Sequence, residues 1–144
     1  MSFACSIHLD ITLTSPWRNC LMVLIIDDEY ALQEVMAEIL GLSGISVVAA
    51  DSGEEGIRLF SKYHDQIRMV FLDLHLPGMG GRATLRALRE IDPHIDVVIM
   101  SGQPQVSAMA EFSGQKHLSY LEKPFTLDVL VASVTTVLTA SECR

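Results

Sequence analysis

Basic residues and cysteines are few in this chain. Its 144 residues include 10 lysines and arginines against 18 aspartates and glutamates, which gives a formal charge of −8. A net-acidic chain is poorly suited to neutralising phosphates, so we expect no direct nucleic-acid binding, while divalent cations and basic protein partners fit better. The three cysteines lie toward the two ends without metal-ligand spacing or a disulfide framework, which is typical of a reducing compartment.

Long apolar runs are also absent. No stretch approaches the length of a membrane span, and the first cation is Arg18, so no basic segment leads into an apolar run at the amino terminus. We therefore expect no membrane segment, no secretory signal and a cytoplasmic location. Hydrophobic residues nevertheless make up 49% of the chain, which is enough for one sizeable core.

Short apolar runs alternate with helical periods from Leu21 onward. Such repeated strand–helix units predict an α/β fold, a parallel sheet with helices on both faces. Gly41 and Gly44 are expected to end the first helix, and Ser52 with Glu55 forms a capping-box pattern that opens the second. Strands are predicted over 21–26, 45–49, 69–72, 97–100 and 118–122, and helices over 32–40, 53–63, 85–91, 106–112 and 127–138, the last capped by Thr126.

This pattern places one domain over residues 21–140, with a short tail at 141–144. Residues 1–20 do not fit it, because apolar and polar residues alternate between Phe3 and Leu13 in a strand-like way. The segment is either an added edge strand, a docking segment or a loosely held extension. We favour the extension, since Met22 would begin the domain cleanly and chain ends are usually poorly ordered unless tied down.

Polar residues follow four of the predicted strands at the point where each ends. Asp27 and Asp28 end the first strand, Asp73 the third, Ser101 the fourth and Lys123 the fifth. Because ligands of open parallel sheets bind at the carboxyl ends of the strands, we expect these five side chains to converge in one crevice. Each alone could be a helix cap, a turn residue or a surface side chain, but their joint occurrence at strand ends favours a site.

The three carboxylates predict a metal and phosphoryl site. They repel one another at neutral pH unless one is protonated or a cation intervenes. Mg²⁺ prefers a few carboxylates together with phosphate oxygens and water, so we expect it as the cofactor. Lys123 and Ser101 would supply a positive charge and a hydroxyl donor for phosphoryl oxygens, which suits phosphoryl transfer to a carboxylate nucleophile.

Four segments carry a resemblance to a known family. They are VLIIDDE at 23–29, VFLDLHLPGMGG at 70–81, VIMSG at 98–102 and LEKPF at 121–125. Together they resemble the receiver domain of two-component response regulators, over about residues 21–138. The resemblance implies a flavodoxin-like, doubly wound sheet of five strands in the order 2-1-3-4-5, with five helices.

The resemblance also implies roles for the acidic residues. Asp73 would be the phosphoacceptor, taking a phosphoryl group from a phosphohistidine on a sensor histidine kinase or histidine phosphotransferase. Asp28, Asp73 and the backbone carbonyl of His75 would bind Mg²⁺. Asp27 would act through water or as a further ligand.

The remaining motif residues are implied to sense the phosphoryl group. Lys123, whose bond to the following proline would be cis, would pair with it, and Ser101 would swing in to hydrogen-bond it. Tyr120 would rotate inward behind Ser101 to complete the switch. The side chains of His75 and Gln103 stand where the family tunes the lifetime of the acyl phosphate.

The function implied is a phosphoprotein switch or phosphorelay carrier that acts on a downstream protein, with no output domain of its own. It would catalyse its own Mg²⁺-dependent phosphorylation and dephosphorylation without being a turnover enzyme. One alternative is a pseudo-receiver that binds a partner independently of phosphorylation. Another, less favoured, is an aspartate-nucleophile phosphohydrolase of the haloacid-dehalogenase type, which typically has a second aspartate where this chain has His75.

Overall fold

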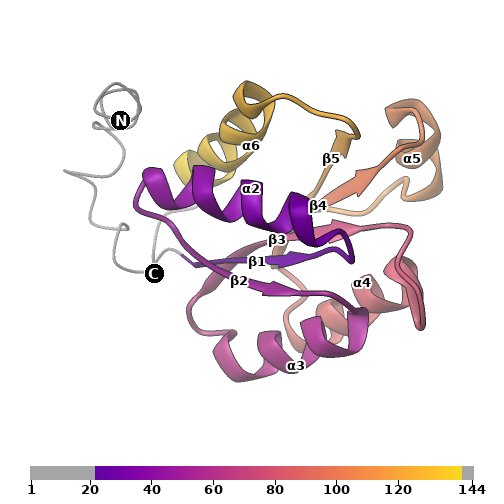
Figure 1. The fold of residues 1–144 in the computed structure, drawn as a ribbon. Helices are drawn as coiled ribbons and strands as arrows, with labels where there is room; N and C mark the ends of the chain where they lie inside the picture. The colour runs from indigo at the N-terminus through magenta and orange to yellow at the C-terminus, as the bar shows by residue number, and fades with distance from the viewer. Residues whose placement is uncertain (1–21, 141–144) are drawn as a thin grey trace.

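Strands and helices alternate throughout residues 22–140, the part of the chain that the computed structural model describes (Figure 1). The alternating segment between Phe3 and Leu13 and the tail at 141–144 lie outside these residues. The elements are β1 (Met22–Ile26), α2 (Tyr30–Leu42), β2 (Ser46–Ala50), α3 (Gly53–Tyr63), β3 (Ile67–Asp73), α4 (Gly80–Ile91), β4 (Asp96–Ser101), α5 (Gln105–Glu111), β5 (Leu118–Glu122) and α6 (Leu127–Ala140).

The five strands form one parallel sheet in the order β2-β1-β3-β4-β5, so the predicted order is confirmed. Helices α2 and α6 lie on one face of the sheet, and α3 and α4 lie on the other (Figure 1). α5 sits beside β5, and Phe112 at its end packs into the core on the α3 and α4 side. All the strands therefore end at one edge of the sheet, as the predicted crevice requires.

The central strands are buried on both faces, which explains their continuous apolar runs. In β3, Val70 and Leu72 pack into the core under α3 and α4, while Met69 and Phe71 pack into the core under α2 and α6. The alternation follows from the strand geometry, since successive side chains point to opposite faces. The sheet thus separates two cores.

Two helix starts follow the predicted caps. The Ser52 hydroxyl accepts the backbone N–H of Glu55 at 3.1 Å, and the Thr126 hydroxyl accepts that of Val129 at 3.3 Å. Only half of the predicted capping box forms, because the Glu55 carboxylate pairs with Arg58 one turn further along α3. An arginine three residues ahead offers that carboxylate a charged partner on the helix surface.

The predicted end of the first helix, at residue 40, was two residues too early. Gly41 lies inside α2, which continues to Leu42. The chain reverses at Gly44, whose φ of +81° is a conformation that glycine adopts without steric cost. The second of the two glycines therefore marks the boundary.

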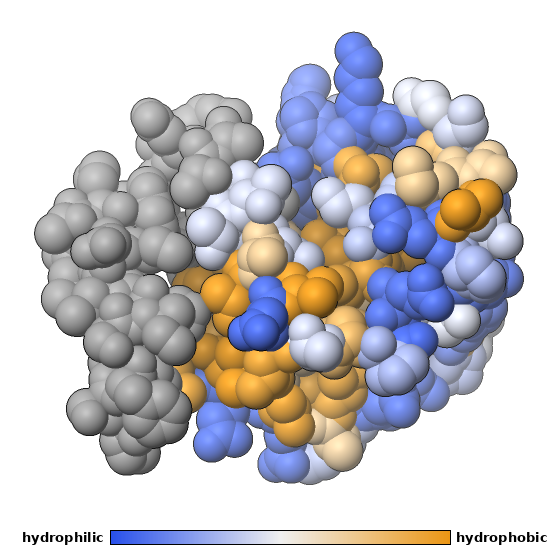
Figure 2. Space-filling view, turned by 90° about the horizontal axis from the view of Figure 1, so that it is seen from above, coloured by the Kyte–Doolittle hydropathy of each residue, from blue (hydrophilic) through white to orange (hydrophobic). Residues whose placement is uncertain are grey.

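The face formed by α2 and α6 carries exposed apolar side chains. Figure 2 looks down on these helices and shows hydrophobic side chains gathered there. α2 leaves Val35 and Leu42 exposed, and α6 leaves Leu127 and Val129 exposed. Even so, no helix within residues 22–140 is both long and apolar enough to cross a bilayer.

Candidate functional site

Three carboxylates meet where β1 and β3 end. The two strands are paired in parallel, with Ile26 opposite Leu72, so Asp27 and Asp73 follow on neighbouring strands. Asp28 is the next residue of the loop. One carboxylate oxygen from each of the three lies within 4.8 Å of the others, as predicted. Asp27 and Asp73 are only 0% and 5% exposed, whereas Asp28 faces solvent.

Lys123 reaches this cluster from the loop between β5 and α6. Its Nζ lies 2.9 Å from Asp27 Oδ2 and 3.4 Å from Asp73 Oδ2, and a third carboxylate, that of Glu29, accepts a hydrogen bond from it at 2.9 Å. The backbone N–H of Lys123 donates to the carbonyl of Ser101 at 2.7 Å, which ties the loop to the end of β4. The peptide bond between Lys123 and Pro124 is cis, in agreement with the expectation.

Burial and charge act against each other in this cluster. Burial raises the pKa of Asp27 above its ordinary value, and hydrogen bonds from Lys123 and from the Glu29 N–H offset this only in part. Burial would lower the pKa of Lys123, but its hydrogen bonds to Asp27 and Glu29 outweigh that effect and raise the pKa. The ammonium group therefore stays charged at neutral pH and balances part of the clustered negative charge.

Short hydrogen bonds within the loops fix how the polar side chains point. Asp27 Oδ1 accepts the N–H of Glu29 at 2.8 Å, and Asp73 Oδ1 accepts that of His75 at 2.9 Å. In both aspartates the second oxygen, Oδ2, is left facing Lys123. Each aspartate side chain is thus held by its own loop while it presents one oxygen to the crevice.

Ser101 and His75 close another side of the crevice. Ser101 is buried, its hydroxyl accepts the N–H of Gln103 at 3.0 Å, and its Oγ lies 3.5 Å from His75 Nε2. Tyr120 lies on β5, half-buried against the core under α3 and α4. Burial first, and the charge of Glu111 second, raise the pKa of Tyr120.

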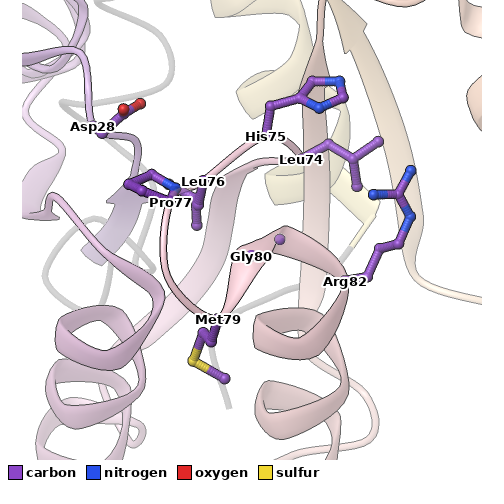
Figure 3. A pocket seen from close by; sticks show the side chains of 9 residues that line it. Asp28, Leu74, His75, Leu76, Pro77, Met79, Gly80 and Arg82 are labelled. Carbon is purple, nitrogen blue, oxygen red and sulfur yellow. The ribbon is translucent and has the colours of Figure 1, made fainter.

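A hollow of about 550 Å³ opens beside the three carboxylates. Figure 3 shows Asp28 on one side of it and His75 with Arg82 on the other. The loop after Asp73 forms its floor together with the start of α4. A small group entering from solvent therefore meets a carboxylate, an imidazole and a guanidinium around one opening.

The sequence that folds into this site matches the model of a known family. The response regulator receiver domain model matches residues 23–135. The chain belongs to this family.

The individual relatives differ in length. This receiver domain is 32% identical to the response regulator protein FleR of Pseudomonas aeruginosa, over 76% of this chain and 23% of FleR. It is 28% identical to the sporulation initiation phosphotransferase F of Bacillus subtilis, over 74% of this chain and 84% of that protein. The crystal structure of a response regulator receiver protein from Sinorhizobium medicae is 31% identical, with a TM-score of 0.73 over 85% of this chain and 97% of that one. The chain thus spans less than a quarter of FleR and most of the other two.

Two interactions of the receiver domain escaped the sequence interpretation. The Gln33 side chain is buried and donates to the carbonyls of Asp27 and Ala50, the second at 3.0 Å, so it joins the ends of β1 and β2 under the site. A polar residue three positions before Met36, on the core side of α2, was the available signal. Arg82 pairs with Glu111 across 29 residues, Nη2 to Oε1 at 2.9 Å, and no local pattern reveals such a pair.

Proposed function

We propose that this receiver domain accepts a phosphoryl group on Asp73 and acts as a phosphorylation-dependent switch or relay carrier. The observation that carries the proposal is the buried Asp73 carboxylate, with two further carboxylates within 4.8 Å and the Lys123 ammonium beside them. The donor would be a phosphohistidine on a sensor histidine kinase or a histidine phosphotransferase. Membership of the receiver family supports that class of partner.

The transfer is a displacement at phosphorus. An Asp73 oxygen forms a bond to the phosphorus while the phosphorus–nitrogen bond of the donor breaks, and the imidazole leaves with the electron pair. The backbone N–H of His75 holds Oδ1 of Asp73, so Oδ2, which faces Lys123, is the oxygen placed to attack. Lys123 would neutralise charge on the phosphoryl oxygens, and alignment with charge neutralisation is most of what this reaction requires.

The donor set fits Mg²⁺. Asp27, Asp28 and Asp73 offer three carboxylate oxygens within 4.8 Å of one another, and carboxylates are the ligands that this ion combines with phosphate and water. These residues, with the backbone carbonyl of His75, would hold it. When bound, the ion supplies positive charge that lowers the repulsion between the carboxylates and an incoming phosphoryl group.

The switch would run from Ser101 to Tyr120. The Ser101 hydroxyl, 3.5 Å from His75 Nε2, would swing toward the phosphoryl group and donate a hydrogen bond to one of its oxygens. That movement would draw the loop after β4 inward and leave room for Tyr120, which lies half-buried on β5. Output would then pass through contact with a downstream protein in the cytoplasm, with no direct binding of nucleic acid. His75 and Gln103, beside the same group, would set how long it lasts.

Intact-protein mass spectrometry after incubation with acetyl phosphate or phosphoramidate tests this function. We expect one phosphoryl adduct on the wild-type chain, dependent on Mg²⁺, and none on Asp73→Asn. Folding of the variant is checked by circular dichroism. An adduct that persists in the folded variant contradicts the assignment of Asp73.

The alternatives give different results in the same experiment. A pseudo-receiver forms no adduct and fails to bind beryllofluoride with Mg²⁺, whereas a receiver with a short-lived acyl phosphate binds beryllofluoride. A phosphohydrolase releases phosphate from a small phosphate ester over many turnovers. Either result would replace the proposed function.

A further inference from the structure

Glu29 competes with the phosphoacceptor for Lys123. The ammonium Nζ is 2.9 Å from Glu29 Oε1 but 3.4 Å from Asp73 Oδ2. Charge-assisted N–H···O bonds are ordinarily about 2.7–2.9 Å long, so the contact with Glu29 is at full strength and the contact with Asp73 is stretched. Lys123 is therefore bonded more closely by Glu29 at the rim and by Asp27 in the interior, Nζ to Oδ2 at 2.9 Å, than by the oxygen that the proposed reaction uses.

Glu29 stands outside the acidic cluster. Its carboxylate is absent from the group of oxygens that Asp27, Asp28 and Asp73 form, and its side chain is 61% exposed. It borders a separate hollow of about 360 Å³, lined also by Leu32, Lys123, Pro124 and Phe125. A residue in this place reaches the Lys123 ammonium from the solvent side, opposite to the buried carboxylates.

The position of Glu29 in the fold would allow another role, which it does not take. Glu29 is the residue before the first turn of α2, where a carboxylate commonly accepts helix N–H groups. Its side chain makes no such bond, although its backbone carbonyl accepts the N–H of Gln33 at 3.1 Å. The carboxylate instead spans from the loop after β1 to the loop after β5 and bonds Lys123.

We infer that Glu29 is a positioning residue that holds Lys123 back from Asp73 and so limits the rate of phosphoryl uptake. The inference rests on the proposed function, because it assigns Lys123 to the incoming phosphoryl group. The Lys123 ammonium has three N–H donors, and Asp27, Glu29 and Asp73 take all three, so a phosphoryl oxygen gains a full hydrogen bond only when one of these contacts is released. Since the Glu29 side chain is largely exposed, its ion pair with Lys123 contributes little free energy. Removing this ion pair should speed phosphoryl uptake by about two- to fivefold.

The test measures the initial rate of adduct formation from acetyl phosphate in the full chain by mass spectrometry. Glu29→Gln removes the charge, and Glu29→Asp keeps the charge but shortens the side chain so that it no longer reaches Nζ. We expect both variants to be faster than wild type by about two- to fivefold. Glu122→Gln is the matched control. It removes an exposed carboxylate next to Lys123 that forms no ion pair within the described residues, and it should leave the rate unchanged.

Three outcomes overturn the inference. If Glu29→Asp behaves as wild type while Glu29→Gln is faster, the effect is charge repulsion toward the anionic donor. If Glu122→Gln is equally fast, the same general electrostatic effect is at work. If both Glu29 variants need more Mg²⁺ for half-maximal rate, Glu29 belongs to the metal site.

A crystal structure of Glu29→Asp separates this inference from the proposed function. We expect the distance from Lys123 Nζ to Asp73 Oδ2 to fall below 3.4 Å, the value in the wild-type chain. An unchanged distance overturns the inference whatever the kinetics show. If wild type forms no adduct at all, the proposed function fails, and the shortened distance would still establish that Glu29 holds Lys123.

Discussion

Asp28 differs from the two carboxylates beside it in its exposure and its contacts. Asp27 and Asp73 are buried and each is held by a backbone N–H and by Lys123. Asp28 faces solvent and makes no hydrogen bond or ion pair with another residue in the part of the chain that the structure describes. Its contribution to the fold should therefore be small, and its contribution to cation binding large.

Replacing Asp28 by Asn should abolish stabilisation by Mg²⁺ without harming the metal-free fold. A ligand at about a hundredfold above its dissociation constant stabilises the native state by about 2.7 kcal/mol, so saturating Mg²⁺ should raise the melting temperature of wild type by several degrees. In Asp28→Asn the metal-free stability should stay within about 0.5 kcal/mol of wild type, as for most exposed substitutions. Calorimetry with and without Mg²⁺ measures both values.

Asp65→Asn is the control for that experiment. Asp65 is exposed, follows α3 at the opposite edge of the sheet from the site, and is paired only with its neighbour His64 among the described residues. Its variant should keep the full response to Mg²⁺. A full response in Asp28→Asn as well would remove Asp28 from the metal site.

Residue identity and position relative to the strands were enough to predict which side chains converge. Asp27, Asp73 and Lys123 follow strands of one parallel sheet, and that topology alone brings them to the same edge. Which partner each of them bonds could not be predicted. Lys123 has three carboxylates in reach, and the strength of each hydrogen bond depends on differences in distance of less than about 1 Å. The bond between Lys123 and Glu29 joins residues 94 positions apart and has no local signature.

At the scale of elements, the contact between α4 and the loop after β3 determines where Asp73 sits. Gly81 is buried at the start of α4, and a Cβ added there would lie 2.6 Å from the carbonyl oxygens of Asp73 and Leu74. Those neighbours are backbone atoms, so they cannot move aside as the end of a side chain would. The helix can approach the loop only because residue 81 has no side chain.

Gly81→Ala should lower both stability and phosphoryl uptake. Overpacking of this kind typically costs about 1–3 kcal/mol, and here the displaced backbone carries the proposed phosphoacceptor. Urea unfolding and the rate of adduct formation measure the two effects. Gly41→Ala is the matched control: its Cβ would meet nothing within 4 Å, so it should stabilise α2 by about 0.5–1 kcal/mol and leave uptake unchanged. Equal rates in the two variants would contradict the role given to Gly81.

Element boundaries show where sequence patterns stop being informative. Apolar runs placed all five strands to within two residues of their start, because a strand buried on both faces has a continuous signal. The end of α2 was misplaced, since either Gly41 or Gly44 could terminate a helix and only the backbone conformation distinguishes them. Helix ends depend on the turn that follows, which periodicity does not describe.

At the scale of the whole molecule, Arg89 links the end of α4 to the segments that lead into β4 and β5. At the end of α4, its guanidinium donates to the carbonyls of Pro93 and Ile95 before β4, and to those of Lys116 and His117 before β5. Burial lowers the pKa of Arg89, while Asp96 and Asp92 act in the opposite direction. The end of the sheet where β4 and β5 start, opposite the site, is therefore tied together by hydrogen bonds within residues 22–140.

The two cores and the two ends of the strands are thus held by contacts among elements within residues 22–140. These contacts limit where an added strand formed by residues 1–20 could pair. β1 is paired on both sides, with β2 and with β3, so an added strand cannot insert beside it. An added strand could pair only with the outer edges of β2 and β5, whereas the apolar face of α2 and α6 offers one surface for a docking segment (Figure 2).

A chain beginning at Met22 should fold as stably as the full chain, with a melting temperature within about 2 °C of it and the same rate of phosphoryl uptake. The physical reason is that the contacts holding the sheet, the crevice and the far edge lie within the retained residues. A loss of 5 °C or more, on the order of 1 kcal/mol for a domain of this size, would instead make residues 1–20 part of the fold. Replacing Phe3, Ile7 and Ile11 together by serine in the full chain then tests whether their shared apolar side is responsible. The same loss in that variant would assign the contact to this side, because an alternating segment can bury only one of its two sides.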